Sequence, residues 1–130
     1  MTEYNFHIDG QVLEAELDQI GHVHHHRIAE WLHNGRVEYL KARSGLYEGV
    51  LDDGYVPHVT NLEMSFIKPI RRDMQYRLLM ALERRGARYV FETKIVQLPD
   101  LEELATTKAE LVFTKDGHVA REDVLQAKTA

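Results

Sequence analysis

An aspartate, a glycine and four histidines lie close together near the start of this sequence of 130 residues. Asp18 is followed three residues later by Gly21, and histidine occupies positions 22, 24, 25 and 26. A carboxylate can act as a nucleophile or as a general base, and imidazole can transfer protons or bind a metal ion. The residues with the greatest capacity for chemistry are therefore gathered in one stretch, from Asp18 to His26.

A long helix is predicted next, beginning at about His22 or His24 and ending near Arg43. Apolar or small residues recur at helical spacing along one face, at Ile28, Leu32, Gly35 and Tyr39. Glycine lowers helix propensity, so its presence at position 35 predicts a very close packing partner on that face. The positive charge of Arg43 and the glycine at position 45 suit the end of a helix.

Gly21 permits a sharp turn that would bring Asp18 towards the first amides of this helix. Those N–H groups have no acceptor within the helix, and they lie at the positive end of its dipole. They can therefore stabilise an oxygen atom that gains negative charge during a reaction. The alternative interpretation is that Asp18 only caps the turn.

The histidines allow a second interpretation, a metal site. His22 and His26 are four residues apart, and His33 follows further along the helix. A zinc site needs three or four ligands that converge, whereas adjacent residues of a helix point in different directions. The spacing therefore favours polar roles for the histidines, and neither a metal nor a cofactor is expected. The roles of His24, His33 and Glu63 stay open.

Composition and charge restrict the class of protein. Hydrophobic residues make up 44% of the chain and charged residues 28%, as in soluble globular proteins. A net charge of −5 argues against nucleic acid or an anionic membrane as the main partner. The sequence has no cysteine, and no apolar run approaches the roughly 18 residues that span a bilayer. The N-terminus lacks the pattern of a signal peptide, so a cytoplasmic location is expected.

Strand-like alternation dominates the remaining sequence. Residues 4–8 and 11–17 flank Asp9 and Gly10, which are predicted to form a hairpin turn or a bulge. A loop is predicted from Leu46 to Pro57. Four further strands are predicted around residues 61–66, 74–82, 89–95 and 105–113, with turns at 69–73, 84–87 and 116–117. Residues 120–130 are predicted to be a polar tail.

These elements predict one α+β domain that spans residues 1–130. The most economical architecture is an antiparallel sheet of about five strands, curved around one long central helix. A single helix cannot cover both faces of such a sheet, and its edge strands remain open. The chain is therefore expected to form a homodimer or a homotetramer through strand edges or the second face.

Several motifs resemble those of the hotdog-fold acyl-CoA thioesterases, in particular the 4-hydroxybenzoyl-CoA thioesterase-like branch. The family pattern reads roughly D-x-D-x-x-G-H-V-N-N, followed by a helix. The matching stretch here is Glu16-Leu-Asp18-Gln-Ile-Gly21-His22-Val23-His24-His25, and Gly35-Arg36, Phe66-Ile-Lys-Pro69 and Asp73 match later positions. Glu16 replaces the first aspartate, and His24 and His25 replace the two asparagines. The resemblance extends from about Leu13 to Glu122. The plant acyl-carrier-protein thioesterases have a related stretch, and Trp31 resembles a tryptophan in it.

The resemblance implies an enzyme that hydrolyses an acyl-coenzyme A thioester to a free acid and CoA without a cofactor. Asp18 occupies the position of the catalytic aspartate, where it would attack the thioester or activate a water molecule. His25, at the start of the helix, is assigned to the catalytic centre as a wall of the thioester site. The amides near His24 and His25 would stabilise the oxyanion.

Six further residues are assigned to substrate binding: Gly21, His22, His24, Lys68, Arg71 and Arg72. The three basic side chains suit the phosphates of CoA, although each of them could equally be a solvated residue of a turn. Two alternative functions stay open. One is a thioesterase that acts on an acyl carrier protein. The other is a non-catalytic protein that binds acyl thioesters, suggested by the altered residues His24, His25, Ile28 and His33. The acyl group stays undetermined.

Overall fold

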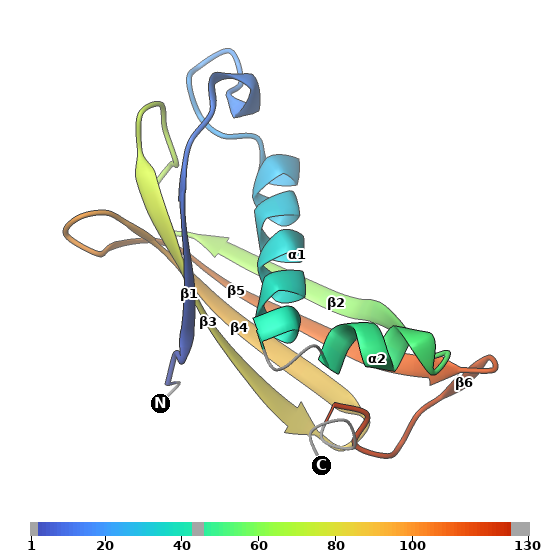
Figure 1. Ribbon diagram of the computed structural model, residues 1–130. Helices are drawn as coiled ribbons and strands as arrows, with labels where there is room; N and C mark the ends of the chain where they lie inside the picture. Colours follow the sequence, from blue (N-terminus) through green and yellow to red (C-terminus); the bar gives the residue numbers. More distant parts are fainter. Residues whose placement is uncertain (1–2, 43–45, 126–130) are drawn as a thin grey trace.

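The computed structural model describes residues 3–42 and 46–125, without the side chains of residues 46–48. Within these residues, six strands form one antiparallel sheet that curls around a long helix, as predicted (Figure 1). The strand order is β1-β3-β4-β5-β2, and β6 pairs with β5. The strands are β1 (Phe6–Gln11), β2 (Val56–Phe66), β3 (Gln75–Arg85), β4 (Arg88–Gln97), β5 (Glu102–Lys115) and β6 (His118–Val119). The helices are α1 (His25–Ala42), α2 (Leu46–Asp52) and a 3₁₀ turn at Glu14–Glu16.

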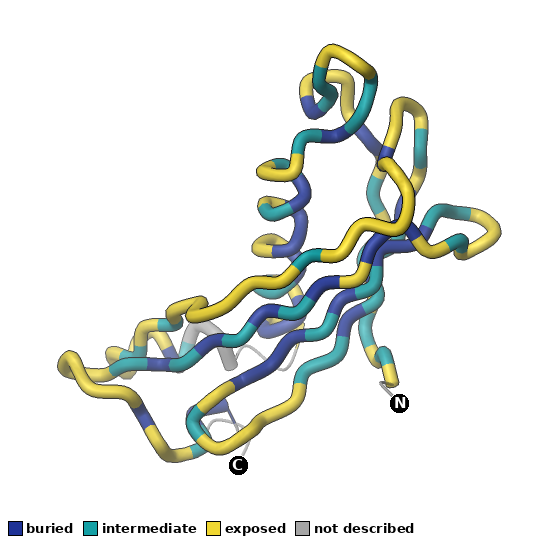
Figure 2. Tube along the Cα trace, turned by 180° about the vertical axis from the view of Figure 1, so that it is seen from behind, coloured by how far each residue is buried: buried dark blue, intermediate teal, exposed yellow. Residues whose placement is uncertain are grey.

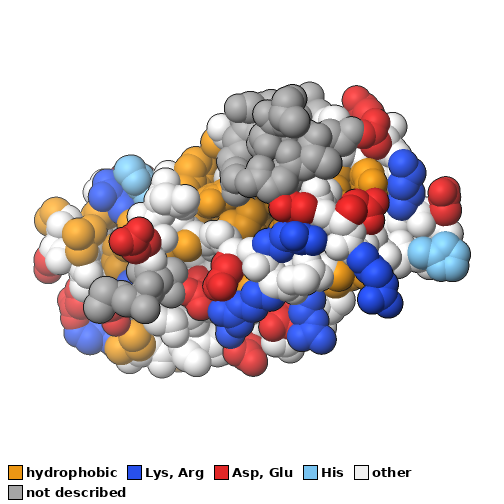
Figure 3. Space-filling model, turned by 90° about the horizontal axis from the view of Figure 1, so that it is seen from below, with side chains coloured by type: hydrophobic (Ala, Val, Ile, Leu, Met, Phe, Trp, Pro, Cys, Tyr) orange, Lys and Arg blue, Asp and Glu red, His pale blue; other side chains and the backbone are white. Residues whose placement is uncertain are grey.

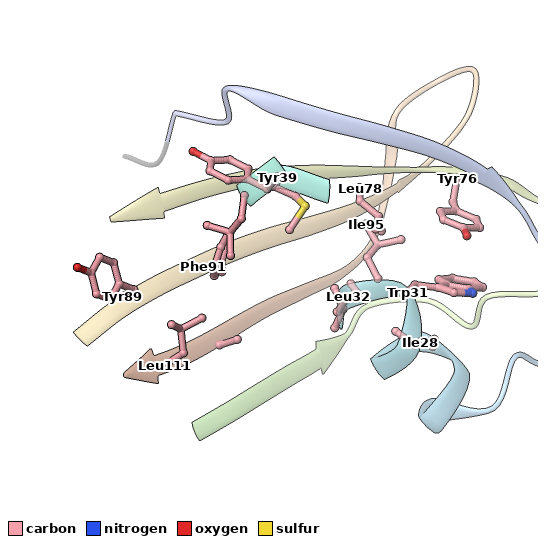
Figure 4. Packing of buried hydrophobic residues seen from close by; sticks show 14 of the residues in the cluster. Ile28, Trp31, Leu32, Tyr39, Tyr76, Leu78, Tyr89, Phe91, Ile95 and Leu111 are labelled. Carbon is pink, nitrogen blue, oxygen red and sulfur yellow. The ribbon is translucent and has the colours of Figure 1, made fainter. Parts of the chain in front are cut away.

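The apolar face of α1 packs onto β3, as the spacing predicted (Figure 4). Ile28 and Leu32 are almost completely buried on this face. A Cβ atom added at Gly35 would lie 3.1 Å from Sδ of Met80 and 3.3 Å from Cδ1 of Leu78. Glycine therefore allows the helix to approach the sheet closely, which confirms the prediction for position 35. The predicted end of α1 at Arg43 and Gly45 lies outside the described residues.

The prediction for Asp9 and Gly10 is wrong, because both residues lie inside β1. Gly10 is opposite Tyr76 of β3, and a Cβ atom at this position would collide with the Tyr76 ring. Asp9 is held by Arg77 on the same neighbouring strand, with 2.7 Å between Oδ1 and Nε. Gly10 therefore leaves room for the ring of Tyr76 on the neighbouring strand and does not form a turn.

The strand predicted over residues 11–17 is also wrong. Strand β1 ends at Gln11, and a 3₁₀ turn forms at Glu14–Glu16. Leu13 is 61% exposed, whereas Glu16 is buried at 9% exposure, so here the charged side chain and not the apolar one is buried. Glu16 is buried because its carboxylate accepts hydrogen bonds from two N–H donors.

Two segments without a predicted regular structure pack onto the core. The loop predicted from Leu46 to Pro57 is instead α2 followed by the start of β2 at Val56, and Val50 of α2 is fully buried. The first part of the predicted tail covers the core with Ala120, Val124 and Leu125. The remaining tail residues, 126–130, lie outside the described part of the chain. The turns predicted near Gly86 and Gly117 are confirmed, and both glycines have positive φ.

Strand β2 forms an exposed edge of the sheet, whereas β4 and β5 alternate between buried and less buried residues (Figure 2). Large apolar side chains on β2 remain open to solvent at Val56, Val59, Leu62 and Phe66. On the face viewed in Figure 3, acidic and basic side chains are interspersed. None of the described helices is long and apolar enough to cross a bilayer.

Candidate functional site

Asp18 lies in a tight turn that begins the connection between the 3₁₀ turn and α1. Its Oδ1 atom accepts hydrogen bonds from the backbone N–H groups of Ile20 and His22, each at 3.0 Å. The turn is closed by a backbone hydrogen bond from Gly21 to Asp18, and Gly21 has a φ of 80°. A bridge between Leu17 and Val23 joins the two sides of the turn. The predicted turn at Gly21 is therefore present.

The hydrogen bonds of the turn favour the ionised form of Asp18. The N–H group of His22 makes the largest contribution and lowers the pKa of Asp18 below its ordinary value of 3.8. The N–H group of Ile20 and the nearby side chains of His22 and His24 act in the same direction, and desolvation opposes them. Within the described residues, Oδ2 of Asp18 has no hydrogen-bond partner. The side chain is thus an anchored carboxylate with one free oxygen.

His24, the residue immediately before α1, borders the same pocket as Asp18. His24 precedes the helix, and its carbonyl oxygen accepts hydrogen bonds from the N–H groups of Arg27 at 3.0 Å and Ile28 at 3.3 Å. The N–H groups of His25 and His26 make no hydrogen bond in the described part of the chain. An open pocket of about 700 Å³ is lined by Leu17, Asp18, Gln19, Ile20 and His24.

His25 lies in a second pocket, apart from the one that Asp18 lines. The ring of His25 stacks on Phe66 at the end of β2, with 4.6 Å between the ring centres and 12° between the planes. This pocket has a volume of about 260 Å³ and is lined by His22, Val23, His25, Ile28 and residues 66–70. His22 contributes to both places, because its backbone N–H group binds Asp18 and the residue also lines the second pocket.

The histidine cluster does not converge on one point. The rings of His24 and His26 are tilted neighbours with 5.1 Å between their centres, whereas His25 points to Phe66. Among residues 3–42 and 46–125, no group of three or more histidines and acids is placed to hold a metal ion.

The three predicted basic residues have different surroundings. Lys68 forms an ion pair with Glu102, and Arg72 forms one with Glu14; all four side chains are exposed. Arg71 forms a backbone bridge with His22, next to the Asp18 turn. Its side chain is exposed and makes no ion pair with another described residue. Arg71 is therefore the basic group that is both near the turn and open for an anion.

The sequence did not predict a role for a cluster of three residues next to the Asp18 turn, formed by Glu16, Trp31 and Tyr76. Oε2 of Glu16 accepts a hydrogen bond from Nε1 of Trp31 at 2.6 Å. The Trp31 ring stacks on Tyr76, with 4.0 Å between the centres and 11° between the planes (Figure 4). Burial, with a contribution from the charge of Glu16, raises the pKa of Tyr76 to about 12. The available signal was an acid two residues before Asp18 and the single tryptophan of the chain.

A sequence model of the Thioesterase-like superfamily matches residues 12–127 of this chain. The chain belongs to this superfamily. The matched region includes Asp18, both pockets and all strands except β1. The predicted family and the enzyme class, thioesterase, are therefore confirmed.

Solved structures with the same fold include several thioesterases. A 1,4-dihydroxy-2-naphthoyl-CoA thioesterase from Synechocystis superposes with a TM-score of 0.83 at 16% identity, over 95% of this chain and 94% of that one. A probable thioesterase from Escherichia coli gives 0.86 at 18% identity, over 95% and 96%. A mutant 4-hydroxybenzoyl-CoA thioesterase, complexed with 4-hydroxybenzoyl-CoA, gives 0.82 at 14% identity, over 96% and 98%. The hotdog fold predicted from the motifs is thus confirmed.

Proposed function

We propose that this protein is a cytoplasmic acyl-CoA thioesterase in which Asp18 carries out the chemistry. The observation that supports this most strongly is the pocket that an ionised carboxylate shares with His24, the residue immediately before α1. Asp18 has one oxygen anchored by two amides and the other free, and it lines the pocket together with His24. A negatively charged group and unpaired N–H donors are the two requirements for attack on a thioester carbonyl.

In the proposed reaction, the carbonyl oxygen of the thioester accepts hydrogen bonds from the N–H groups of His25 and His26. These donors, at the positive end of α1, stabilise the oxyanion as the carbonyl carbon becomes tetrahedral. Oδ2 of Asp18 either attacks this carbon directly or removes a proton from an attacking water molecule. Direct attack expels the CoA thiolate and leaves an acyl anhydride, which water then hydrolyses. Both routes consume one water and release the acid and the thiol.

The side chains around the turn support a role in holding CoA. Arg71 is exposed beside His22 and is available for a phosphate group. Lys68 and Arg72 are held in exposed ion pairs, which contribute little and which a phosphate can replace. Gly21 and His22 shape the turn, and His24 lines the pocket of Asp18. Two of the three solved structures described above are named for CoA thioesters of aromatic acids.

His25 fits the role of a wall of the thioester site rather than that of a proton carrier. Its ring is stacked on Phe66 at 4.6 Å, in a pocket that Ile28 and Ile70 also line. Such a flat aromatic surface can contact the acyl part of a substrate next to the reacting carbonyl. The assignment of His25 to the catalytic centre is retained in this restricted sense.

We also propose that the protein acts as a homo-oligomer, either a dimer or a tetramer. Strand β2 is an edge strand of 11 residues with four exposed large apolar side chains. An edge of this length and character is a site for strand pairing, and a second copy of the chain offers a self-complementary partner. The same edge ends at Phe66, so a second copy would lie beside the pocket of His25.

The test is a thiol-release assay over short, long and aromatic acyl-CoA thioesters, with the same acyl groups on an acyl carrier protein as a second panel. We expect turnover of at least one CoA thioester. Turnover of carrier-bound thioesters alone would instead assign the protein to the acyl-carrier-protein thioesterases. Binding without turnover across both panels, detected as thermal stabilisation, would show a non-catalytic binding protein and overturn the proposal.

A further inference from the structure

Glu16 is a buried carboxylate for which the proposed reaction has no direct use. It is 9% exposed and lies two residues before Asp18. Its Oε1 atom accepts the N–H group of Leu13 at 2.9 Å, and its Oε2 atom accepts Nε1–H of Trp31 at 2.6 Å. A buried carboxylate is expensive to desolvate and contributes little net stability even when it is fully paired. Its burial therefore suggests a function other than stability.

The two hydrogen bonds require a carboxylate at this position. Both partners are N–H donors, and each uses a different oxygen of Glu16. Glutamine has a similar size, but it offers one acceptor oxygen and one NH₂ donor. Either Leu13 or Trp31 would then face a second donor and lose its hydrogen bond. Glu16→Gln therefore breaks one of the two hydrogen bonds with almost no change in side-chain volume.

Glu16 connects the segment before Asp18 to α1 at two points. Its carbonyl oxygen accepts the N–H group of His24 at 3.0 Å, just before the helix begins. Its side chain binds Trp31 in the second turn of the helix. Trp31 is held in turn by its stacking on Tyr76 of the sheet (Figure 4). The backbone on one side of Asp18 is therefore fixed relative to the helix and the sheet together.

We propose that Glu16 is a positioning residue, which sets the direction and distance of Asp18 relative to the first amides of α1 through its hydrogen bond to Trp31. This inference rests on the proposed function of Asp18. Glu16 does not touch the substrate pocket that Asp18 lines. Catalytic geometry is sensitive to small shifts, and a misplacement of about 1 Å can reduce the rate about 100-fold. The hydrogen bond between Glu16 and Trp31 therefore affects the rate of turnover and leaves the surfaces that contact the substrate unchanged.

The experiment compares Glu16→Gln and Trp31→Phe with the wild-type enzyme on its best thioester. Trp31→Phe removes the N–H donor and keeps an aromatic ring against Tyr76. We expect kcat to fall about 10- to 100-fold in both variants, with KM within about twofold of wild type. Trp31 is the only tryptophan, so its fluorescence emission reports directly on the loss of the carboxylate in Glu16→Gln.

Asp123→Asn is the matched control. Asp123 is a partly buried carboxylate that accepts the hydroxyl of Tyr89 at 2.9 Å, and neither residue lines the pockets of Asp18 and His25. We expect a loss of stability with unchanged kcat. An equal fall of kcat in this control would attribute the effect of Glu16→Gln to general loosening and would overturn the proposal.

A double-mutant cycle with Asp18→Asn separates the two proposals. If Glu16 acts through Asp18, Glu16→Gln causes almost no further fall of kcat in the Asp18→Asn background. An equal fall in both backgrounds overturns the positioning role, as does a fall of less than about tenfold in Trp31→Phe or a rise in KM alone. If Glu16→Gln does not fold, Trp31→Phe in both backgrounds decides. Wild-type turnover of Asp18→Asn itself means that the proposed function of Asp18 has failed, not only the role of Glu16.

Discussion

The start of α1 lies beside a polar turn and two pockets, whereas near its other end buried aromatic rings pack together, among them Tyr39, Phe91 and Tyr89 (Figure 4). Tyr39 packs edge-on against Phe91 there, with 5.4 Å between the ring centres. Tyr89 packs in the same way against Phe113, also at 5.4 Å. The comparison separates two tasks: the aromatic end stabilises the fold, and the polar end holds groups that can react.

The polar end illustrates how much structure a reactive carboxylate requires. Asp18 occupies two backbone amides, and Glu16 behind it occupies two more N–H donors. Burying the Glu16 carboxylate and pairing it with two N–H donors within the fold yields little net stability. Apolar burial at the other end must offset this cost. Substitutions at the aromatic end should therefore lower stability, whereas substitutions at the polar end should lower activity.

The largest effect is expected for Phe113→Ala at the aromatic end. The Phe113 side chain is fully buried against Tyr89, so its removal should lower the free energy of unfolding by about 3–5 kcal/mol. We expect kcat of the folded fraction to stay within about twofold of wild type, since the residue is in neither pocket. Urea unfolding and active-site-normalised kinetics measure the two quantities. A fall of kcat in proportion to stability would contradict the separation of the two ends.

Asp18→Asn is the converse variant at the polar end. Asparagine keeps an oxygen that accepts the amides of Ile20 and His22, but it is not basic or nucleophilic. The rate of thioester hydrolysis should fall at least about 100-fold, with nearly unchanged binding. Stability should shift by only a few tenths of a kcal/mol, because asparagine also caps turns well. A folded variant with wild-type turnover on the best substrate would remove Asp18 from the mechanism.

A charged residue on the β2 edge tests whether copies of the chain assemble through this strand. Leu62→Asp places a carboxylate in the exposed apolar row of β2 and should shift the assembly towards monomer. Val119→Asp on β6 is the matched control, since Val119 is also exposed and apolar but lies outside β2. Light scattering across a range of concentrations gives the oligomeric state. A wild-type protein that is already a fully active monomer would disprove the proposed assembly.

The smallest change is expected in the dependence of the rate on pH. The pKa of Asp18 is lowered by the N–H group of His22, so its carboxylate stays ionised as the pH falls from 7 to 5. The ratio kcat/KM should stay nearly constant over this range and decline only below about 3.8, if the protein remains folded. The stabilising contribution of these amides is likewise present above 3.8 and is lost as the pH falls through the lower folded value. An acid limb near pH 6.5 would instead indicate an essential histidine.

Patterns within short segments predicted the parts of the fold that depend on near neighbours. The periodicity from Ile28 to Tyr39 identified α1, and glycines 86 and 117 identified two turns. The motif around Asp18 predicted the turn at Gly21 and, through its family resemblance, the hotdog fold.

The features that sequence reasoning missed depend on partners distant in the chain. Gly10 is explained only by Tyr76, which lies on another strand. The burial of Glu16 requires Trp31, and α2 is anchored by Val50 against a core assembled from many segments. The separation of His25 from Asp18 arises from its stacking on Phe66, a contact 41 positions away along the chain that helical spacing could not indicate.

The division of the site into two pockets has a consequence for how such an enzyme can diversify. The pocket of Asp18 is lined by residues of one short segment, 17–20 and 24, whereas the pocket of His25 is also lined by the distant residues 66–70. Substitutions in the second segment can reshape that wall while the turn that holds the carboxylate is inherited intact. Under selection for a new acyl group, descendants of this protein should therefore accumulate changes at residues 66–70 before any at Asp18 or Gly21.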